Sequence, residues 1–276
     1  MKILSANGAN IPALGLGTFR LQGSECTDIV LQALDAGYRH VDTAAFYENE
    51  VEIGEAIRQT GIAREDIFLT TKVWPSEVSD GPFQASVEAS LERLMLEQVD
   101  LLLIHWPPKN SDYSGWAKLL NEAADRGWTK HIGVSNFTTS HIDAIVEASD
   151  RPIVVNQVEN HPYLNQAKVR AACARHGIAV MGYCPLGRGQ MMLEDPVING
   201  IAHETGKTPA QVILRWHVEH EGAGAIPKTS SPHRLVENLD IFDFELNPSQ
   251  MASMQALTLQ HQRLCDYDFS PQWDLP

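Results

Sequence analysis

The stretch Arg39-His40-Val41-Asp42-Thr43-Ala44-Ala45-Phe46-Tyr47-Glu48-Asn49-Glu50 joins a short β-prone run to a helix start at Asn49 and Glu50. The run ends on a carboxylate, Asp42, and the loop after it carries Tyr47 forward, so the two side chains are expected to face one cleft. Taken alone, these residues fit a turn aspartate and an ordinary half-buried aromatic better than a site. The pattern becomes informative because it recurs further along the chain.

Several other apolar runs also end on a chemically capable side chain. These are Phe68 to Thr71 before Lys72, Leu101 to Ile104 before His105, Val134 before Ser135-Asn136, Val154-Val155 before Asn156-Gln157, and Met181-Gly182 before Tyr183. Helical patterns separate the runs, and each strand-plus-helix unit takes about 30 residues, as in βαβ units. Such alternation predicts parallel strands joined by right-handed crossovers.

Eight such strands are expected: Ala13–Leu16, Arg39–Asp42, Ile67–Lys72, Val99–His105, His131–Val134, Ile153–Gln157, Ile178–Tyr183 and Gly224–Ile226. We therefore predict an α/β fold, a (β/α)8 TIM barrel forming a single domain over residues 1–276. Asn7-Gly8 predicts a β-hairpin ahead of the barrel, placed to plug one end. The continuously apolar strands favour a closed barrel over an open sheet only in part, so a doubly wound fold stays as the alternative.

The segment after about Leu246 predicts one more helix and then a tail, His261 to Pro276, with little periodicity. Its aromatic residues Tyr267, Phe269 and Trp273 could pack over a barrel mouth. Composition fits a loosely ordered terminus equally well.

Charge and composition limit the possible partners. The chain has 21 basic and 35 acidic residues and a net charge of −14, which argues against nonspecific binding to nucleic acid or anionic membranes. There is no secretory apolar segment at the N-terminus and no apolar run of membrane-spanning length, so a soluble, cytoplasmic protein is expected. Cys26, Cys173, Cys184 and Cys265 have no CxxC spacing and are expected to be free thiols, mostly buried.

Some motifs resemble known sites and fail on inspection. The segment Gly222 to Thr229 differs from a P-loop because Pro227 stands where the second glycine should be, and proline removes an N–H that would face phosphate. His217-Val-Glu-His220 lacks the HExxH spacing, and no HxH pair marks the first strand end, so no metal site is predicted. Gly15-Leu-Gly17 has no third glycine at Rossmann spacing.

Strand ends of a barrel meet at its C-terminal face, so Asp42, Lys72 and His105 should converge beside Tyr47. That grouping has a chemical use. An ammonium about 4 Å from a phenol, at an effective dielectric constant of about 20, stabilises phenolate by roughly 4 kcal/mol, or about 3 pH units before desolvation. We therefore expect Lys72 to lower the pKa of Tyr47 and Asp42 to hold the lysine charged and in place.

Short motifs at these strand ends and loops carry a family resemblance. They are Gly17-Thr18-Phe19, Asp42-Thr43-Ala44 through Tyr47-Glu48-Asn49-Glu50, Thr71-Lys72-Val73-Trp74, Asp100 to Pro107, Ile132 to Phe137, Asn156-Gln157, and Ile226-Pro-Lys228-Thr229. Together they make the chain resemble the aldo-keto reductases over essentially its whole length. The nearest likeness is to the short prokaryotic members similar to 2,5-diketo-D-gluconate reductases.

The resemblance implies an NADPH-dependent carbonyl reductase that acts on a small-molecule substrate, and a monomer is expected rather than an oligomer. It implies Tyr47 as general acid, Lys72 and Asp42 as its tuning pair, and His105 as the residue that orients the carbonyl. The implied NADPH/NADP contacts are Gly17, Thr18, Asp42, Ser135, Asn136, Gln157, Tyr183, Leu186, Lys228, Thr229, Arg234 and Asn238, and the implied substrate pocket is Phe19, Trp74 and Trp106. Two alternatives stay open: a cofactor-binding barrel without turnover, and a barrel hydrolase or isomerase of unrelated lineage.

Three local features refine these expectations. Only a short segment, Pro107 to Ser114, separates His105-Trp106 from the next helix, so one wall of the pocket should be open, and small keto sugars or α-dicarbonyls should be preferred. Lys228 to Arg234 joins two cations and hydroxyl donors to a helix start, which favours the 2′-phosphate of NADPH over NADH. Cys184 stands where serine commonly precedes Pro185, and it is expected to be an oxidisable thiol near the cofactor.

Overall fold

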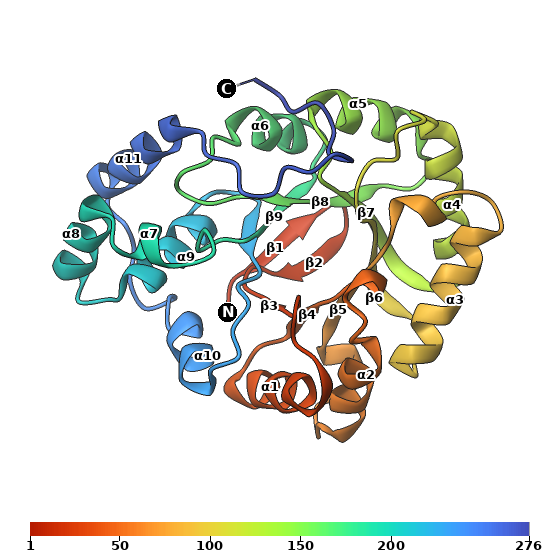
Figure 1. Cartoon of the computed structure of the whole chain (residues 1–276), viewed down its shortest axis with the longest axis horizontal. Coiled ribbons are helices and arrows are strands. Elements are labelled where there is room, and N and C mark those ends of the chain that lie inside the picture. The colour runs from red at the N-terminus through yellow and green to blue at the C-terminus, as the bar shows by residue number, and fades with distance from the viewer. Residues whose placement is uncertain (276) are drawn as a thin grey trace.

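The computed structural model describes residues 1–275 and consists of a hairpin, a ring of parallel strands and an outer layer of helices (Figure 1). The hairpin pairs β1 (Ile3–Ala6) with β2 (Ala9–Pro12). The parallel strands are β3 (Leu16–Gly17), β4 (His40–Asp42), β5 (Phe68–Val73), β6 (Val99–Ile104), β7 (Thr129–Ser135), β8 (Ile153–Glu159), β9 (Ala179–Tyr183) and β10 (Ala223–Ala225).

Helices follow the strands in the alternation that the sequence predicts. They are α1 (Gly23–Ala36), α2 (Glu50–Gln59), α3 (Pro82–Leu94), α4 (Tyr113–Asp125), α5 (Thr139–Ala148), α6 (Ala167–Arg175), α7 (Gln190–Leu193), α8 (Pro196–Thr205), α9 (Pro209–Glu219), α10 (Pro232–Leu239) and α11 (Pro248–Leu257). Strands β5, β6 and β8 are buried along their whole length, because the barrel interior covers one face and the helices the other.

The barrel closes between the segment around β3 and the end of β10. Neighbouring strands pair in parallel from β3 through to β10, and Leu14 bridges Ala225 in parallel. Gly15 N donates to Ala225 O over 2.9 Å and Ala225 N to Ala13 O over 2.8 Å. The (β/α)8 prediction is therefore confirmed, and the doubly wound alternative is excluded. The first strand is shorter than predicted: regular pairing with β4 covers only Leu16 and Gly17.

Gly17 lies at a close backbone approach within this seam. A Cβ atom placed on it would lie 2.7 Å from the carbonyl oxygen of Ile226, well inside van der Waals contact. Its backbone N–H donates to Pro227 O over 3.0 Å. A side chain at this position would push apart the strand ends that carry the cleft.

The hairpin closes the opposite end of the barrel. Asn7 and Gly8 both have positive φ, 45° and 87°, as the tight turn requires. Asn7 Nδ2 donates to Ile153 O, at the start of β8, over 2.8 Å and to His176 O over 2.9 Å. The predicted plug is thus confirmed, and it lies at the amino ends of the strands.

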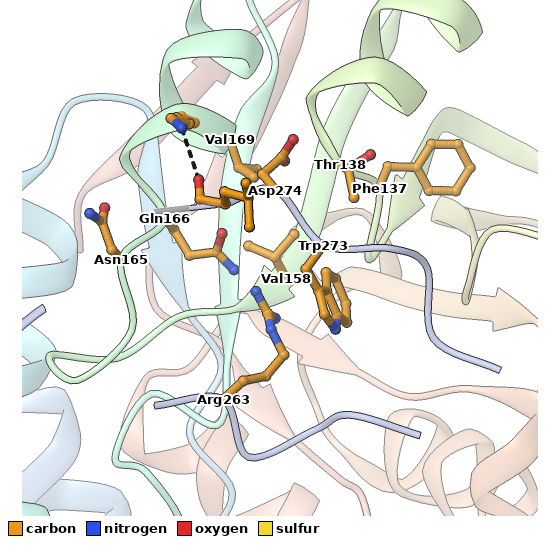
Figure 2. A pocket seen from close by; sticks show the side chains of 11 residues that line it. Phe137, Thr138, Val158, Asn165, Gln166, Val169, Arg263, Trp273 and Asp274 are labelled. Atoms are coloured by element: carbon orange, nitrogen blue, oxygen red, sulfur yellow. Dashed lines mark hydrogen bonds between the residues drawn. The ribbon is translucent and has the colours of Figure 1, made fainter. Parts of the chain in front are cut away.

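The C-terminal tail crosses the mouth of the barrel (dark blue in Figure 1) and is held by specific contacts. Glu159, at the end of β8, accepts the backbone N–H groups of Leu264 and Cys265, each over 2.7 Å. Asp274 accepts Thr139 N over 2.9 Å at the start of α5, and the Arg263 guanidinium lies 3.6 Å from the Trp273 ring centre. Figure 2 shows Arg263, Trp273 and Asp274 around the same small pocket as Val158 of β8 and Thr138, which precedes α5. The loosely ordered alternative is therefore wrong for the described part of the tail.

Within the described residues, none of the helices combines the length and the apolar character needed to cross a bilayer.

Candidate active site

The predicted site residues gather at the carboxyl ends of the strands around one cavity of about 1010 Å³. Seventeen of them line it: Gly17, Thr18, Phe19, Asp42, Tyr47, Trp74, His105, Trp106, Ser135, Asn136, Gln157, Tyr183, Leu186, Lys228, Thr229, Arg234 and Asn238. The remaining one, Lys72, is buried behind Tyr47. The predicted residues therefore share one cavity, because parallel strands bring their ends to one rim.

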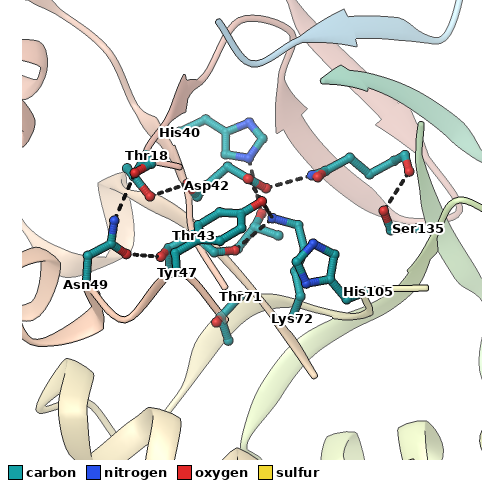
Figure 3. Close-up of polar contacts among 12 residues, drawn as sticks. Thr18, His40, Asp42, Thr43, Tyr47, Asn49, Thr71, Lys72, His105 and Ser135 are labelled. Atoms are coloured by element: carbon teal, nitrogen blue, oxygen red, sulfur yellow. Dashed lines mark hydrogen bonds and ion pairs between the residues drawn. The ribbon is translucent and has the colours of Figure 1, made fainter. Parts of the chain in front are cut away.

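Lys72 is the centre of the polar cluster on the cavity floor (Figure 3). Its Nζ donates to Asp42 Oδ1 over 2.6 Å, to Thr43 O over 2.8 Å and to Tyr47 Oη over 3.4 Å. The ammonium group makes three bonds, so its donors are all used. Because Lys72 donates to the phenol oxygen, the Tyr47 O–H proton is left to point elsewhere, into the cavity.

A second layer of hydrogen bonds fixes this cluster. Gln157 Nε2 donates to the other carboxylate oxygen of Asp42 over 2.6 Å. Asn49 Nδ2 donates to Thr18 O and its Oδ1 accepts from Thr43 Oγ1, which ties the loop before α2 to the end of β4. The predicted helix start at Asn49 thus has a second use, because it holds the loop that carries Tyr47.

The pKa of Tyr47 is shifted in the direction opposite to the sequence-based expectation. Burial raises the pKa of Tyr47 well above its usual value, and the charge of Asp42 adds to the effect. The first reason is desolvation, which disfavours the charged phenolate. The second is that Asp42 neutralises Lys72 at 2.6 Å, so the phenol faces an ion pair with little net charge rather than a free cation. Burial also lowers the pKa of Lys72, against the opposing effect of Asp42. At neutral pH Tyr47 is therefore a protonated phenol.

His105 follows β6 directly and stands edge-on to Tyr47, with ring centres 5.6 Å apart at 74°. Burial first, and the charge of Lys72 second, hold the pKa of His105 well below its usual value. Its Nδ1 has no hydrogen-bond partner within residues 1–275. A neutral imidazole at this place can donate one N–H to an oxygen in the cavity.

Three polar side chains form the wall beside His105. Asn136 Nδ2 donates to His105 O over 2.9 Å and to Ser135 Oγ over 3.1 Å, and Ser135 Oγ donates to Gln157 O over 2.8 Å. Tyr183, at the end of β9, donates its hydroxyl to Asn136 Oδ1 over 2.7 Å. The wall therefore presents amide and hydroxyl groups next to an aromatic ring.

The far end of the cavity is formed by the segment from β10 to α10. Lys228 and Arg234 are exposed, and neither makes an ion pair with any residue of the described chain. Ser231, which precedes α10, makes no side-chain cap, and Pro232 takes the first position of the helix. The first N–H groups of α10 and two free cations thus face the same rim, which is a favourable arrangement for a phosphate group. Glu237 also lines this end of the cavity.

The tail contributes aromatic side chains to the pocket wall that was expected to be open. The ring of Phe269 lies 5.4 Å from Trp74 and 5.2 Å from Trp106, and Tyr267 lies 5.9 Å from Trp106. Lys109, in the short segment after His105-Trp106, donates to Asp268 O over 3.0 Å. The open-wall expectation is wrong, because the tail covers what the short segment leaves uncovered.

Sequence reasoning also missed several residues that line the cavity: Arg20, Phe46, Arg188, Glu237 and Cys265. Phe46 had a signal, since it precedes Tyr47, and its ring stacks on Trp74 at 4.1 Å. Arg20 and Arg188 lie in loops, Glu237 lies on α10 and Cys265 lies on the tail, and none of them stands where an apolar run ends. Among the described residues, no group of three or more His, Cys, Asp or Glu side chains is placed to hold a metal ion.

The family model described as "Aldo/keto reductase family" matches residues 13–258 of this chain. The chain is 44% identical over 257 residues to an aldo-keto reductase of Mycolicibacterium smegmatis, covering 93% of each protein. It is 42% identical over 252 residues to the glyoxal reductase of Bacillus subtilis, covering 91% of this chain and 90% of that protein. A crystal structure provisionally assigned as a 2,5-diketo-D-gluconic acid reductase B has a TM-score of 0.96 and 44% identity, covering 100% of this chain and 98% of that one.

Proposed function

Because the chain belongs to the aldo-keto reductase family of carbonyl oxidoreductases, we propose that it reduces small, polar aldehydes and ketones with hydride from NADPH and a proton from Tyr47. The observation that carries this proposal is the continuity of the cavity. A buried Asp42–Lys72 pair with a phenol lies at one end, and two unpaired cations beside a helix start lie at the other.

Tyr47 is suited to give up a proton to a reacting oxygen. Its raised pKa keeps the phenol protonated at neutral pH, and the bond from Lys72 occupies the back of the phenol oxygen. When the proton leaves, phenolate charge develops 3.4 Å from an ammonium group, which stabilises that charge. Lys72 thus acts during proton transfer rather than by lowering the resting pKa.

His105 is suited to orient the carbonyl. Since its pKa is held low, it is a neutral donor and does not compete with Tyr47 as an acid. Its ring stands edge-on to Tyr47 and to Trp74, at 5.6 Å and 5.1 Å, so the rotation of the imidazole is restricted. A carbonyl oxygen that accepts from both His105 and Tyr47 would be fixed at two points.

The residues along the cavity fit a dinucleotide. We assign Ser135, Asn136 and Gln157 to the nicotinamide carboxamide, with Tyr183 against the ring. Lys228, Thr229 and Arg234 would take the 2′-phosphate, and the buried amide of Asn238 would lie at the adenine end. When bound, the reduced nicotinamide supplies the hydride. The 2.7 Å hydrogen bond from the Tyr183 hydroxyl to Asn136 Oδ1 would have to open before that oxygen could bind the carboxamide.

The pocket around Tyr47 favours small carbonyl compounds. Phe19, Trp74 and Trp106 surround the cluster, and Phe269 from the tail limits the space above them. Arg20 at the rim adds a polar, cationic group. The names of the relatives, a glyoxal reductase and a diketogluconate reductase, agree with α-dicarbonyls and keto sugars as the substrate class.

The proposal is tested by following NADPH absorbance with the purified protein and a panel of carbonyls. The panel includes glyoxal, a keto sugar and a bulky steroid ketone, each with NADPH and with NADH. We expect turnover with NADPH and the highest specificity constant for a small dicarbonyl. NADPH binding without turnover of any carbonyl would support the non-catalytic alternative. A steroid ketone with the highest specificity constant would refute the substrate assignment.

A further inference from the structure

Two cysteines from distant parts of the chain meet in the cavity wall. Cys184 follows Tyr183 at the end of β9, and Cys265 lies in the tail where Glu159 anchors it. Both line the cavity described above, and each thiol is the largest influence on the pKa of the other, as expected of close neighbours. Cys184 has a φ of 48°, in the left-handed region that side chains disfavour, so the turn after β9 holds it in an uncommon conformation.

Arg188 places a positive charge on this pair. Its Nη2 donates to Cys265 Sγ over 3.0 Å and to Tyr267 Oη over 3.2 Å. Arg188 makes no ion pair with a carboxylate among residues 1–275. A cation next to sulfur favours the thiolate over the thiol.

Other charged and titratable groups also bear on Cys265. These are Glu159, Arg263, Tyr47, Tyr183 and Tyr267, together with Cys184 and Arg188. The neighbouring Cys184 side chain is the largest influence, and it lowers the pKa of Cys265 to about 7 against burial and the charge of Glu159. The pKa of Cys184 is raised, first by the neighbouring Cys265 side chain and then by burial. At neutral pH one sulfur is therefore an available nucleophile and its neighbour remains protonated.

The remaining cysteines provide an internal reference. Cys26 and Cys173 are fully buried in the core, and burial raises the pKa of each to about 12. Neither lines the cavity. Four thiols in one chain thus divide into two inert ones and two that share a cation and an open cavity.

From this geometry we propose that Cys265 and Cys184 form a hydroperoxide-sensitive thiol pair. The Cys265 thiolate attacks the distal oxygen of a hydroperoxide, the O–O bond breaks, and an alcohol or water leaves once its oxygen has taken a proton from solvent. Cys265 is then a sulfenic acid. The Cys184 sulfur, after losing its proton, attacks the sulfenic sulfur, the S–S bond forms and water departs. The two thiols together lose two electrons, which the hydroperoxide gains, and an external dithiol reverses the change.

The disulfide would fasten the tail to the turn after β9. Tyr267 and Phe269 lie just beyond Cys265 and pack on Trp106, while Tyr183 lies just before Cys184. Oxidation would therefore fix the cover of the pocket to its wall. This inference does not depend on the proposed catalytic function, because its primary test does not measure turnover.

The test begins with full-length, reduced protein without cofactor, treated with hydrogen peroxide near pH 7 and mapped by mass spectrometry without reduction. We expect the protein to lose the mass of two hydrogens and to yield a peptide pair joined through Cys184 and Cys265. Cys184→Ser should give no crosslink but a sulfenic acid at Cys265 that dimedone traps. Cys265→Ser should leave Cys184 unmodified, and Cys173→Ser should crosslink like the wild type. Failure of the wild type to form this disulfide, or oxidation of Cys26 or Cys173 as fast as Cys265, would overturn the proposal.

A second measurement tests the origin of the reactivity. The rate of Cys265 alkylation by iodoacetamide is followed against pH in the wild type, Cys184→Ser, Cys184→Ala and Arg188→Met, each checked for folding by circular dichroism. Serine keeps a hydrogen-bond donor, so its midpoint should stay near the wild-type value of about 7. Alanine and the Arg188 variant should move the midpoint upward. Identical midpoints in all four proteins would show that the contacts with Cys184 and Arg188 do not activate Cys265.

Discussion

Two buried carboxylate–cation clusters lie side by side near the start of α2, and they differ in what surrounds them. Asp42 and Lys72 are both buried, with side chains 2% and 0% exposed, and a phenol completes their cluster at the cavity. Glu50 is also 0% exposed, but its partner Arg93 is 38% exposed. Thr71 donates to one oxygen of Glu50, and Arg93 donates twice to the other.

Adjacent residues of β5 thus serve opposite sides of the barrel wall. Lys72 faces the cavity cluster, whereas Thr71 faces the Glu50–Arg93 pair between α2 and α3. In the outer cluster each carboxylate oxygen has a partner within the protein. In the inner cluster the Tyr47 proton has none, and Nδ1 of neighbouring His105 has none among residues 1–275. Unused hydrogen-bonding capacity at a cavity, rather than burial of charge, distinguishes a candidate reacting site from a structural one.

The largest effect is expected from removing the Tyr47 hydroxyl, which lies on the cavity side of the barrel wall. Tyr47→Phe removes the proton donor, so carbonyl reduction should fall by at least about a hundredfold while NADPH affinity stays within a few-fold. Thr71→Val, the matched control, removes a hydroxyl from the outer cluster and should leave kcat nearly unchanged in folded protein. Steady-state kinetics and cofactor titration measure both. More than a tenth of wild-type turnover in Tyr47→Phe would remove this residue from its proposed role.

The cations of the two clusters can be exchanged for methionine in the same way. Lys72→Met leaves the buried Asp42 carboxylate without its cation, with only the Gln157 amide still bonded to it, which should lower the free energy of unfolding by about 3 to 5 kcal/mol and also abolish most activity. Arg93→Met should cost about 3 kcal/mol, because solvent reaches that side, and should retain kcat in the folded fraction. Urea unfolding and kinetics on the same samples separate the two effects. Equal losses of kcat in both variants would end the distinction between the clusters.

A smaller effect is expected from single cations at the other end of the cavity. Arg234 is unpaired within the described chain, whereas Lys207 pairs with Asp240 and Asp243 over 2.9 Å and 2.7 Å. Charge-assisted bonds contribute roughly 1.5 to 3 kcal/mol, so Arg234→Ala should weaken NADPH about tenfold to a hundredfold and leave NADH nearly unaffected. Lys207→Ala should change neither. Fluorescence titration of both cofactors decides this, and equal losses for NADPH and NADH would mean that Arg234 does not contact the 2′-phosphate.

The sequence predicted one class of feature well and another poorly. Asp42, Lys72 and His105 could be placed together because each follows an apolar run of strand length, and strand ends of a barrel must share a rim. The tail contacts could not be predicted. Glu159 holds Leu264 and Cys265 through their backbone N–H groups, and such bonds require no particular residue type on the tail.

The direction of the Tyr47 pKa shift was missed for a related reason. Distance to Lys72 could be anticipated from the strand ends, but desolvation and the balance of charge around the phenol depend on all the groups that enclose it. The same applies to Cys265, whose partners Cys184 and Arg188 lie in the turn after β9. Pairings of this kind between loops leave no periodic signal in the sequence.

Two histidines differ in the same way, one at the cavity and one in the barrel wall. The smallest expected effect is on the pH dependence of the free energy of unfolding. His105 faces the cavity, whereas His217 on α9 is buried in the wall, with contacts to Asn160 and to Pro185 O. Burial lowers the pKa of His217 to about 3. Above the unfolded pKa of about 6.5 both states are neutral at this residue. As pH falls below that value, the unfolded chain takes up a proton that the folded chain refuses, so stability decreases until about pH 3. At pH 5 this amounts to about 2 kcal/mol.

His217→Gln keeps a polar side chain but does not titrate, so the free energy of unfolding should fall less steeply between pH 6.5 and pH 5 than in the wild type. His203→Gln, on the exposed face of α8, controls for the general effect of replacing a histidine. Urea titrations at pH 7.5, 6.5, 5.5 and 5 provide the slopes. Other buried histidines contribute to the wild-type slope, so the difference between the variants, rather than the slope itself, reports on His217. If His217→Gln loses stability with falling pH as steeply as the wild type, the pKa of His217 is not lowered in the folded protein.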